Sequence, residues 1–118
     1  MENSVGGKYF RINAKVDVTT EIARSWLSEL ANYSRESGVH NYFFDVRNVK
    51  NISNVTDNYN FAHHDVSSLN IEKTGRHAIL VSPDDHSHDF IETSMLNAGY
   101  NVKIFHDEDQ AINWLEEA

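Results

Sequence analysis

The fold of this chain is decided by the stretch from Arg76 to Leu115, which reads RHAILVSPDDHSHDFIETSMLNAGYNVKIFHDEDQAINWL. Within it, two short apolar runs alternate with a dense polar segment and with two runs of helical spacing: Arg76–Ser82, Pro83–Asp89, Phe90–Ala98, Asn101–Phe105 and Asp107–Leu115. Gly99 separates the first helical run from the second strand, and Asp107 and Gln110 have the spacing of a capping box at the start of the last run. Two short strands joined through a helix of this length predict a parallel β-α-β crossover.

The residues before this stretch extend the same alternation toward the N-terminus. Residues 8–16 alternate polar and apolar side chains, which predicts a strand with one face on the core. The apolar residues from Ile22 to Tyr33 fall on one broad stripe, which predicts a helix. Thr19 is the expected N-cap of this helix, and Gly38 stands where a glycine commonly follows a helix end.

A second strand and helix complete the pattern. The short apolar run Tyr42–Val46 is typical of a buried central strand. A polar, asparagine-rich loop follows, and a second helical stripe then consists of Val55, Tyr59, Ala62, Val66 and Leu69. The predicted fold class is therefore α/β: a mainly parallel four-stranded sheet in β-α-β-α-β-α-β-α order, with helices covering both faces. The first strand is expected to join at an edge, in either direction.

Composition limits the classes of function. The 118 residues are expected to form a single domain, 1–118, with residues 1–7 as a flexible N-terminus. There is no cysteine, which excludes disulfides and thiolate chemistry. A net charge of −8 argues against nucleic acid as a partner, and no apolar run is long enough for stable membrane insertion. The chain is expected to be cytoplasmic, because its N-terminus lacks the pattern of a secretory signal.

Polar side chains follow each of the later strands, where an open parallel sheet places its ligand edge. Because these loops meet at the carboxyl ends of the strands, we expect a candidate ligand rim formed by six residues: Asp45, Arg47, Asp84, His86, His88 and Asp107. Nine aromatic residues could in addition line an apolar pocket, although core packing is the default for them: Tyr9, Phe10, Trp26, Phe43, Phe44, Phe61, Phe90, Phe105 and Trp114.

Metal binding and catalysis are the less favoured readings of this rim. Imidazole and carboxylate groups suit several divalent metals, but His86 and His88 lack the spacing of a ligand motif. A histidine beside a carboxylate also has the chemistry of an acid or base, yet no nucleophile elbow, phosphate loop or dinucleotide turn is present. We therefore expect no catalytic residue, no metal and no cofactor.

Several segments resemble the STAS-like, SpoIIAA-like domains, small α/β proteins related to sporulation anti-sigma-factor antagonists and to cytoplasmic domains of sulphate transporters. The likeness spans nearly the whole chain, and these segments carry it: Tyr9–Ile12, Phe43–Val49, Ser87–Thr93, Ala98–Phe105 and Ala111–Leu115. The later segments are similar to a stand-alone bacterial branch without an assigned activity. The resemblance implies a non-enzymatic regulatory or protein-interaction domain.

The chain departs from the family at the site that the resemblance would make a phosphoswitch. The antagonists carry Asp-Ser-Ser-Gly at the start of the helix after the central strand, whereas this chain has Ile52-Ser-Asn-Val-Thr56. Ser53 or Thr56 could accept a phosphate only if the register shifts. The expected surface for a protein partner, or for self-association as a homodimer, is formed by Ser53, Thr56, Asn58, Tyr59 and His63. The alternative function is binding of a small ligand or lipid at the rim.

Overall fold

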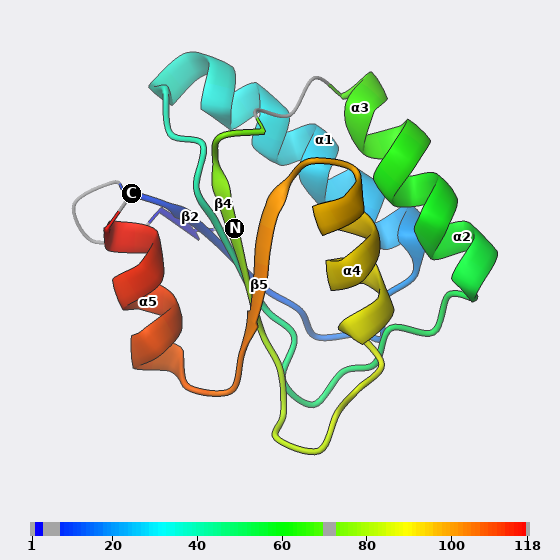
Figure 1. Cartoon of the computed structure of the whole chain (residues 1–118). Coiled ribbons are helices and arrows are strands. Elements are labelled where there is room, and N and C mark those ends of the chain that lie inside the picture. Colours follow the sequence, from blue (N-terminus) through cyan, green and yellow to red (C-terminus); the bar gives the residue numbers. More distant parts are fainter. Residues whose placement is uncertain (1, 4–7, 70–72, 118) are drawn as a thin grey trace.

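The computed structural model describes residues 2–3, 8–69 and 73–117, which fold into a sheet with helices on both faces (Figure 1). The strands in this part of the chain are β1 (Glu2–Asn3), β2 (Phe10–Asn13), β3 (Tyr42–Asp45), β4 (Arg76–Leu80) and β5 (Asn101–Phe105). Their order in the sheet is the order in the chain. The four strands from β2 to β5 are parallel, and β1 pairs with β2 in the antiparallel sense. The predicted α/β class with a mainly parallel sheet is confirmed.

The helical segments divide unequally between the two faces of the sheet. They are α1 (Thr20–Ser37), α2 (Val55–Asn60), the π-helical turn η1 (Phe61–Asp65), α3 (Val66–Ser68), α4 (Asp89–Asn97) and α5 (Glu108–Glu116). Because consecutive parallel strands are neighbours, crossovers of one hand place their helices on one side. In the described part of the chain, α1, the α2–α3 region and α4 share one face, and α5 alone covers the other (Figure 1).

The predicted helix signals act as expected. The Thr19 side chain accepts a hydrogen bond from the Ile22 amide, which caps the first turn of α1. Gly38 ends that helix with φ of 76°, a left-handed conformation that glycine adopts without steric cost. Asp107 likewise caps α5 by accepting from the Gln110 amide. These local signals fix where α1 starts and ends and where α5 starts.

The stripe predicted for the second helix is right from Ala62 onward and wrong before it. Val55 and Tyr59 are 62% and 50% exposed, whereas Asn58 is 4% exposed and faces the core. The π-helical turn η1 interrupts the α-helical spacing at Phe61. Its wider turn brings both Phe61 and Ala62 into the core, so the buried face does not follow a simple apolar stripe.

Two larger apolar cores lie on the two faces of the sheet, and a third, smaller cluster of Val18, Val46, Val49 and Val81 lies near the carboxyl ends of the strands. The first core packs β2, β3 and β5 residues against α1, η1 and α4, and includes Phe10, Leu30 and Val66. The second core lies under α5 and includes Phe43 and Leu115. Long cationic side chains cover parts of the α5 face that the single helix leaves open. The guanidinium of Arg11 lies over the Phe43 ring, and Lys103 and Arg76 lie near the rings of Phe105 and Trp114.

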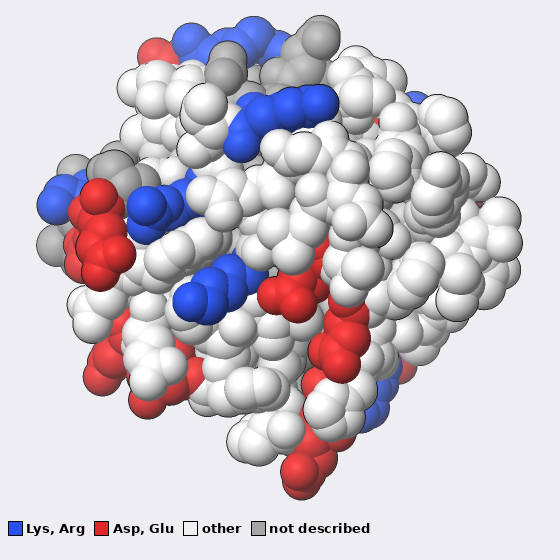
Figure 2. All heavy atoms as spheres, viewed as in Figure 1, with Lys and Arg blue, Asp and Glu red and all other residues white. Residues whose placement is uncertain are grey.

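The N-terminal part differs in detail from the prediction. The first parallel strand covers only Phe10–Asn13 of the predicted residues 8–16, and Val16 is 58% exposed. Of the predicted flexible N-terminus 1–7, Glu2 and Asn3 form β1, and the other five lie outside the described residues. On the face in Figure 2, Lys and Arg side chains are scattered among acidic and uncharged ones and form no continuous patch.

Candidate functional site

The predicted rim residues lie at one end of the molecule, where the parallel strands end. Asp45 is the last residue of β3, Arg47 follows it, and Asp107 follows β5. Asp84, His86 and His88 belong to the loop between β4 and α4. Although they share an end, these side chains form separate groups on the two faces of the sheet.

The first group is an ion-pair network on the α5 face. Arg11 donates to Asp45 Oδ2 at 3.0 Å and to Glu108 Oε1 at 2.8 Å. Arg47 donates to the same two carboxylates at 2.7 and 3.1 Å. Burial alone would raise the pKa of Asp45, but hydrogen bonds from Arg47 and Arg11 more than offset this effect and hold the pKa below 3.8. Two cations and two carboxylates thus satisfy one another, which leaves no obvious vacant charge for a ligand.

Three further rim residues lie outside this network. Asp107 uses its carboxylate to cap α5. His86 is exposed and pairs with Asp89 through Nδ1, at 3.1 Å from Oδ2. Asp84 is exposed in the turn after β4. Each of these residues has a local role or a solvated position, so the six predicted rim residues do not converge on one ligand.

The sixth rim residue, His88, belongs to the opposite face. Its side chain is 4% exposed, and Nε2 lies 3.2 Å from the Val49 carbonyl oxygen and 3.5 Å from Asp85 Oδ2. Asp85 also accepts from the Ser87 amide at 2.9 Å and lies 3.4 Å from Lys50 Nζ. These contacts tie the β4–α4 loop to the loop after β3 and build one wall of a cavity.

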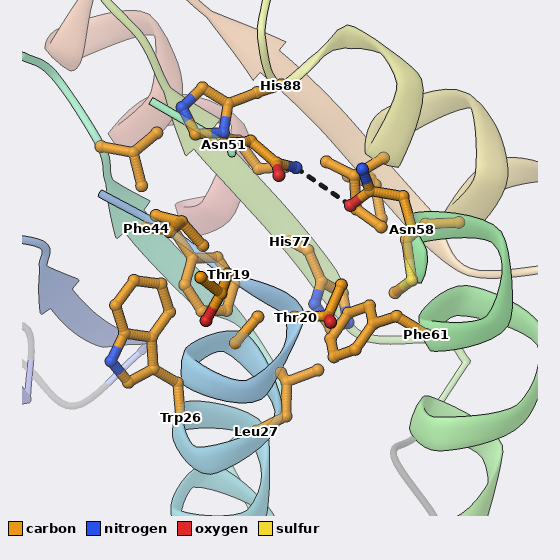
Figure 3. Close-up of a pocket in the computed structure, with 17 residues that line it drawn as sticks. Thr19, Thr20, Trp26, Leu27, Phe44, Asn51, Asn58, Phe61, His77 and His88 are labelled. Carbon is orange, nitrogen blue, oxygen red and sulfur yellow. Dashed lines mark hydrogen bonds between the residues drawn. The ribbon is translucent and has the colours of Figure 1, made fainter. Parts of the chain in front are cut away.

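The cavity lies between the sheet and the helices on the face that α1, the α2–α3 region and α4 cover, which we call the three-helix face. Its volume is about 80 Å³. Side chains from several elements turn toward this space in Figure 3, among them Trp26 and Leu27 of α1, Phe44 of β3, His77 of β4 and Phe61 of η1. None of the described residues that line it is Asp, Glu, Lys or Arg. The lining is therefore almost wholly apolar inside, with a few uncharged polar groups.

Several polar groups lie at the end of the cavity beside the carboxyl edge of the sheet. Asn51 donates to Asn58 Oδ1 at 3.0 Å, the bond drawn in Figure 3, and accepts from the Ser53 amide. Phe44 and Ile79, which stand on central strands, are only partly buried. Residues at the centre of a covered sheet face are ordinarily fully buried, so their exposure indicates that solvent reaches the cavity.

At the inner end of the cavity stands His77, the second residue of β4. Its side chain is buried, and the rings of Tyr42, Phe44 and Tyr100 have centroids 4.8, 6.3 and 6.3 Å from the imidazole. Nε2 has no hydrogen-bond partner among the described residues. Burial lowers the pKa of His77 from 6.5 to about 4, so the ring is neutral near pH 7.

The predicted partner surface is only partly a surface. Thr56 and Tyr59 are exposed, and the Tyr59 ring lies 4.3 Å from that of His63. The Ser53 hydroxyl is occupied because it accepts from the Thr20 amide at 2.9 Å. Asn58 is a correction: its buried amide donates to the Ser53 and Asn54 carbonyls, so it cannot meet a partner at the surface.

The described part of the chain holds neither a metal-binding cluster nor a membrane-spanning helix. Among the described residues, no three His, Cys, Asp or Glu side chains are grouped so that they could hold a metal ion. Within the same part of the chain, every helix is too short or too polar to span a membrane.

Comparisons with protein-family models, curated proteins and solved structures found no match to this chain. No relative therefore suggests a catalytic activity. Sequence reasoning missed His77, the most unusual of them. A signal was present, because a histidine two residues before Ile79 in an apolar strand shares the buried face of that residue.

Proposed function

We propose that this chain is a non-enzymatic domain that binds a small, mainly apolar molecule in the cavity between the sheet and the three-helix face. The observation that carries this proposal is a solvent-reachable apolar cavity that is lined by His77, whose buried Nε2 has no hydrogen-bond partner among the described residues. Binding sites for small molecules are concave and mostly apolar, with a few placed polar groups. The cavity between α1, α4 and the sheet has this character.

The packing around the cavity supports the same proposal. Protein interiors are close-packed, and apolar side chains that border open space make fewer contacts than those in a filled core. The nearby Ala23 has space beside it that a larger side chain would fill. A ligand that occupies the space would recover the missing contacts.

A cavity-filling variant tests the proposal. Ala23→Leu adds three carbons to a residue that lines the cavity, so it should block binding without opening the fold. Ser28→Leu is the matched control, because Ser28 is exposed on the same helix. The probes are 1-pentanol, cyclohexanol and toluene, and binding is measured by two-dimensional NMR and by thermal shift. Ligands that bind only the folded state raise the melting temperature.

The expected result is that at least one probe moves the resonances of Phe44, Phe61 and His77 in the wild type and in Ser28→Leu. The same probe should leave Ala23→Leu unchanged. The proposal fails if no probe perturbs these resonances in the wild type, or if Ala23→Leu binds as well as Ser28→Leu does.

A second function, association with a protein or with a second copy of the chain, has one observation in its favour. Ile52, Val55 and Tyr59 are 60%, 62% and 50% exposed near the start of α2, an unusual density of large apolar side chains on a surface. If this surface forms a homodimer, light scattering at micromolar concentration should give twice the mass of the chain. Val55→Asp should restore a monomer, whereas Asn60→Asp, a charge change at an exposed polar position, should not.

The resemblance to the stand-alone bacterial STAS-like, SpoIIAA-like domains supports a regulatory role in the cytoplasm for either function. It rests on the motifs quoted above. A phosphoswitch would use Thr56 more readily than Ser53, because Thr56 is exposed and the Ser53 hydroxyl already accepts the Thr20 amide. Mass spectrometry of the chain isolated from its own cells tests this point. Absence of phosphate at both residues across growth conditions would remove it.

A further inference from the structure

The chemistry of the cavity wall restricts the kind of ligand beyond being small and apolar. Two buried side-chain nitrogens lack a hydrogen-bond partner in the described part of the chain, His40 Nδ1 and His77 Nε2. Of these two residues only His77 lines the cavity. A buried polar atom without a partner costs about 1–3 kcal/mol, and such atoms in native proteins call for an explanation.

Four of the other polar residues that line the cavity are already engaged. Thr19 caps α1, Asn51 and Asn58 bond to each other and to backbone groups, and His88 lies against the Val49 carbonyl. None of these pairs needs a ligand to be satisfied. His77 is different, because its three aromatic neighbours enclose the ring without offering a partner to Nε2.

The described lining of the cavity also restricts the charge that a ligand can carry. With no Asp, Glu, Lys or Arg among the described lining residues, an ion in the cavity would lose its hydration and find no opposite charge. A neutral imidazole can donate from or accept at Nε2, depending on its tautomer, so a hydroxyl group suits either form. The volume of about 80 Å³ favours a molecule or chain end of few heavy atoms.

We propose that the cavity selects an uncharged small molecule, or the end of a longer one, with a hydroxyl or similar group that hydrogen-bonds His77 Nε2. This inference rests on the proposed function, since it names the ligand class of the same site. The apolar walls from α1, β3 and η1 hold the carbon skeleton of the ligand. The imidazole then discriminates against molecules of equal shape that cannot form the hydrogen bond.

Matched probes test this selection. The wild-type chain is titrated with 1-pentanol, with 1-chlorobutane, which has a similar shape without the hydroxyl, and with pentanoate, which carries a charge. Because the missing hydrogen bond leaves Nε2 unpaired, 1-pentanol should bind about tenfold more tightly than 1-chlorobutane. Pentanoate should bind more weakly still. Two-dimensional NMR of the cavity residues supplies the three dissociation constants.

A variant tests whether the His77 imidazole causes the preference for 1-pentanol over 1-chlorobutane. His77→Phe keeps a flat ring of similar size without a nitrogen, so it should bind 1-pentanol and 1-chlorobutane equally. If this variant does not fold, long-range ¹H–¹⁵N NMR of the His77 ring in the wild type replaces it. Binding of 1-pentanol should then shift the Nε2 signal, whereas 1-chlorobutane should leave it in place.

The outcomes separate this inference from the proposed function. Equal affinities for 1-pentanol and 1-chlorobutane in the wild type, or an unmoved Nε2 signal with the alcohol bound, would overturn the selection by His77 and leave cavity binding intact. Tightest binding by pentanoate would overturn the uncharged class. If toluene reaches the cavity residues while neither 1-pentanol nor cyclohexanol does so at any concentration, the hydroxyl-bearing ligand class is wrong. If no probe in either set reaches these residues, the proposed function itself falls.

Discussion

The two faces of the sheet differ in whether the polar groups near the core have partners. On the α5 face, Arg11, Asp45, Arg47 and Glu108 lie together and satisfy one another within 3.1 Å. On the three-helix face, three aromatic rings surround a histidine whose Nε2 has no partner among the described residues, and the packing leaves a cavity beside it. A closed network holds a fold together. On the three-helix face, by contrast, a ligand in the cavity could hydrogen-bond His77 Nε2 and stabilise the folded state.

The largest expected difference between the faces is in packing. Phe43 and Phe44 are adjacent on β3 and point to opposite faces, with Phe43 fully buried and Phe44 partly exposed. Phe43→Ala should lower the free energy of unfolding by about 3–5 kcal/mol, because it empties a filled core. Phe44→Ala should cost roughly half as much, because its ring already borders open space. Urea unfolding measures both losses, and equal losses would contradict the difference between the faces.

The next effect is a loss of stability in acid that belongs to the three-helix face. The unfolded chain protonates His77 below its ordinary pKa of 6.5, while the folded chain does so only below about 4. The folded state therefore loses up to about 3 kcal/mol relative to the unfolded state as the pH falls through this window. Chemical unfolding at a series of pH values measures the loss.

The matched control for this acid effect is another histidine. His77→Gln should remove the stability change between pH 6.5 and 4, and His106→Gln should retain it, because His106 is exposed. An unchanged slope in His77→Gln would show that the buried imidazole is not the group that titrates. A change of the same size in both variants would also contradict the prediction.

The smallest effect belongs to the α5 face and to a lower pH range. Because the pKa of folded Asp45 lies below 3.8, its ion pairs stabilise the fold above that pH and are lost as the pH falls further. Asp45→Asn should lower the free energy of unfolding by about 1 kcal/mol at pH 7, since the pairs are partly solvated. It should also reduce the pH dependence of the free energy of unfolding below pH 3.8. The exposed Asp109 provides the control as Asp109→Asn, and an equal effect of both changes would disprove the role of the network.

The sequence carried enough information for the framework of the fold. The strand Asn101–Phe105 is as predicted, and the strand starting at Arg76 is two residues shorter than predicted. The caps Thr19 and Asp107 and the glycine Gly38 mark the helix ends through local hydrogen bonds or backbone freedom, and these effects act within a few residues.

The candidate site was less accessible to sequence reasoning, because it depends on volume and on distant contacts. The apolar run Tyr42–Val46 and the stripe of the first helix assigned Phe44 and Trp26 to the core, but such patterns cannot say whether the core is filled. The π-helical turn at Phe61 likewise has no signal in apolar spacing. The rim was predicted at the correct end of the strands. The rim side chains separate because they lie on different faces of the sheet. The sequence of a loop, such as the one that carries His88, does not show which face a side chain occupies.

The most direct test of the cavity as a ligand site is a high-resolution crystal structure of the chain with 1-pentanol. We predict the alcohol between α1, α4 and the sheet, with its oxygen roughly 2.7–3.2 Å from His77 Nε2. A structure in which the alcohol is absent from this space, or in which Trp26 or Phe61 has turned to fill it, would contradict the proposal.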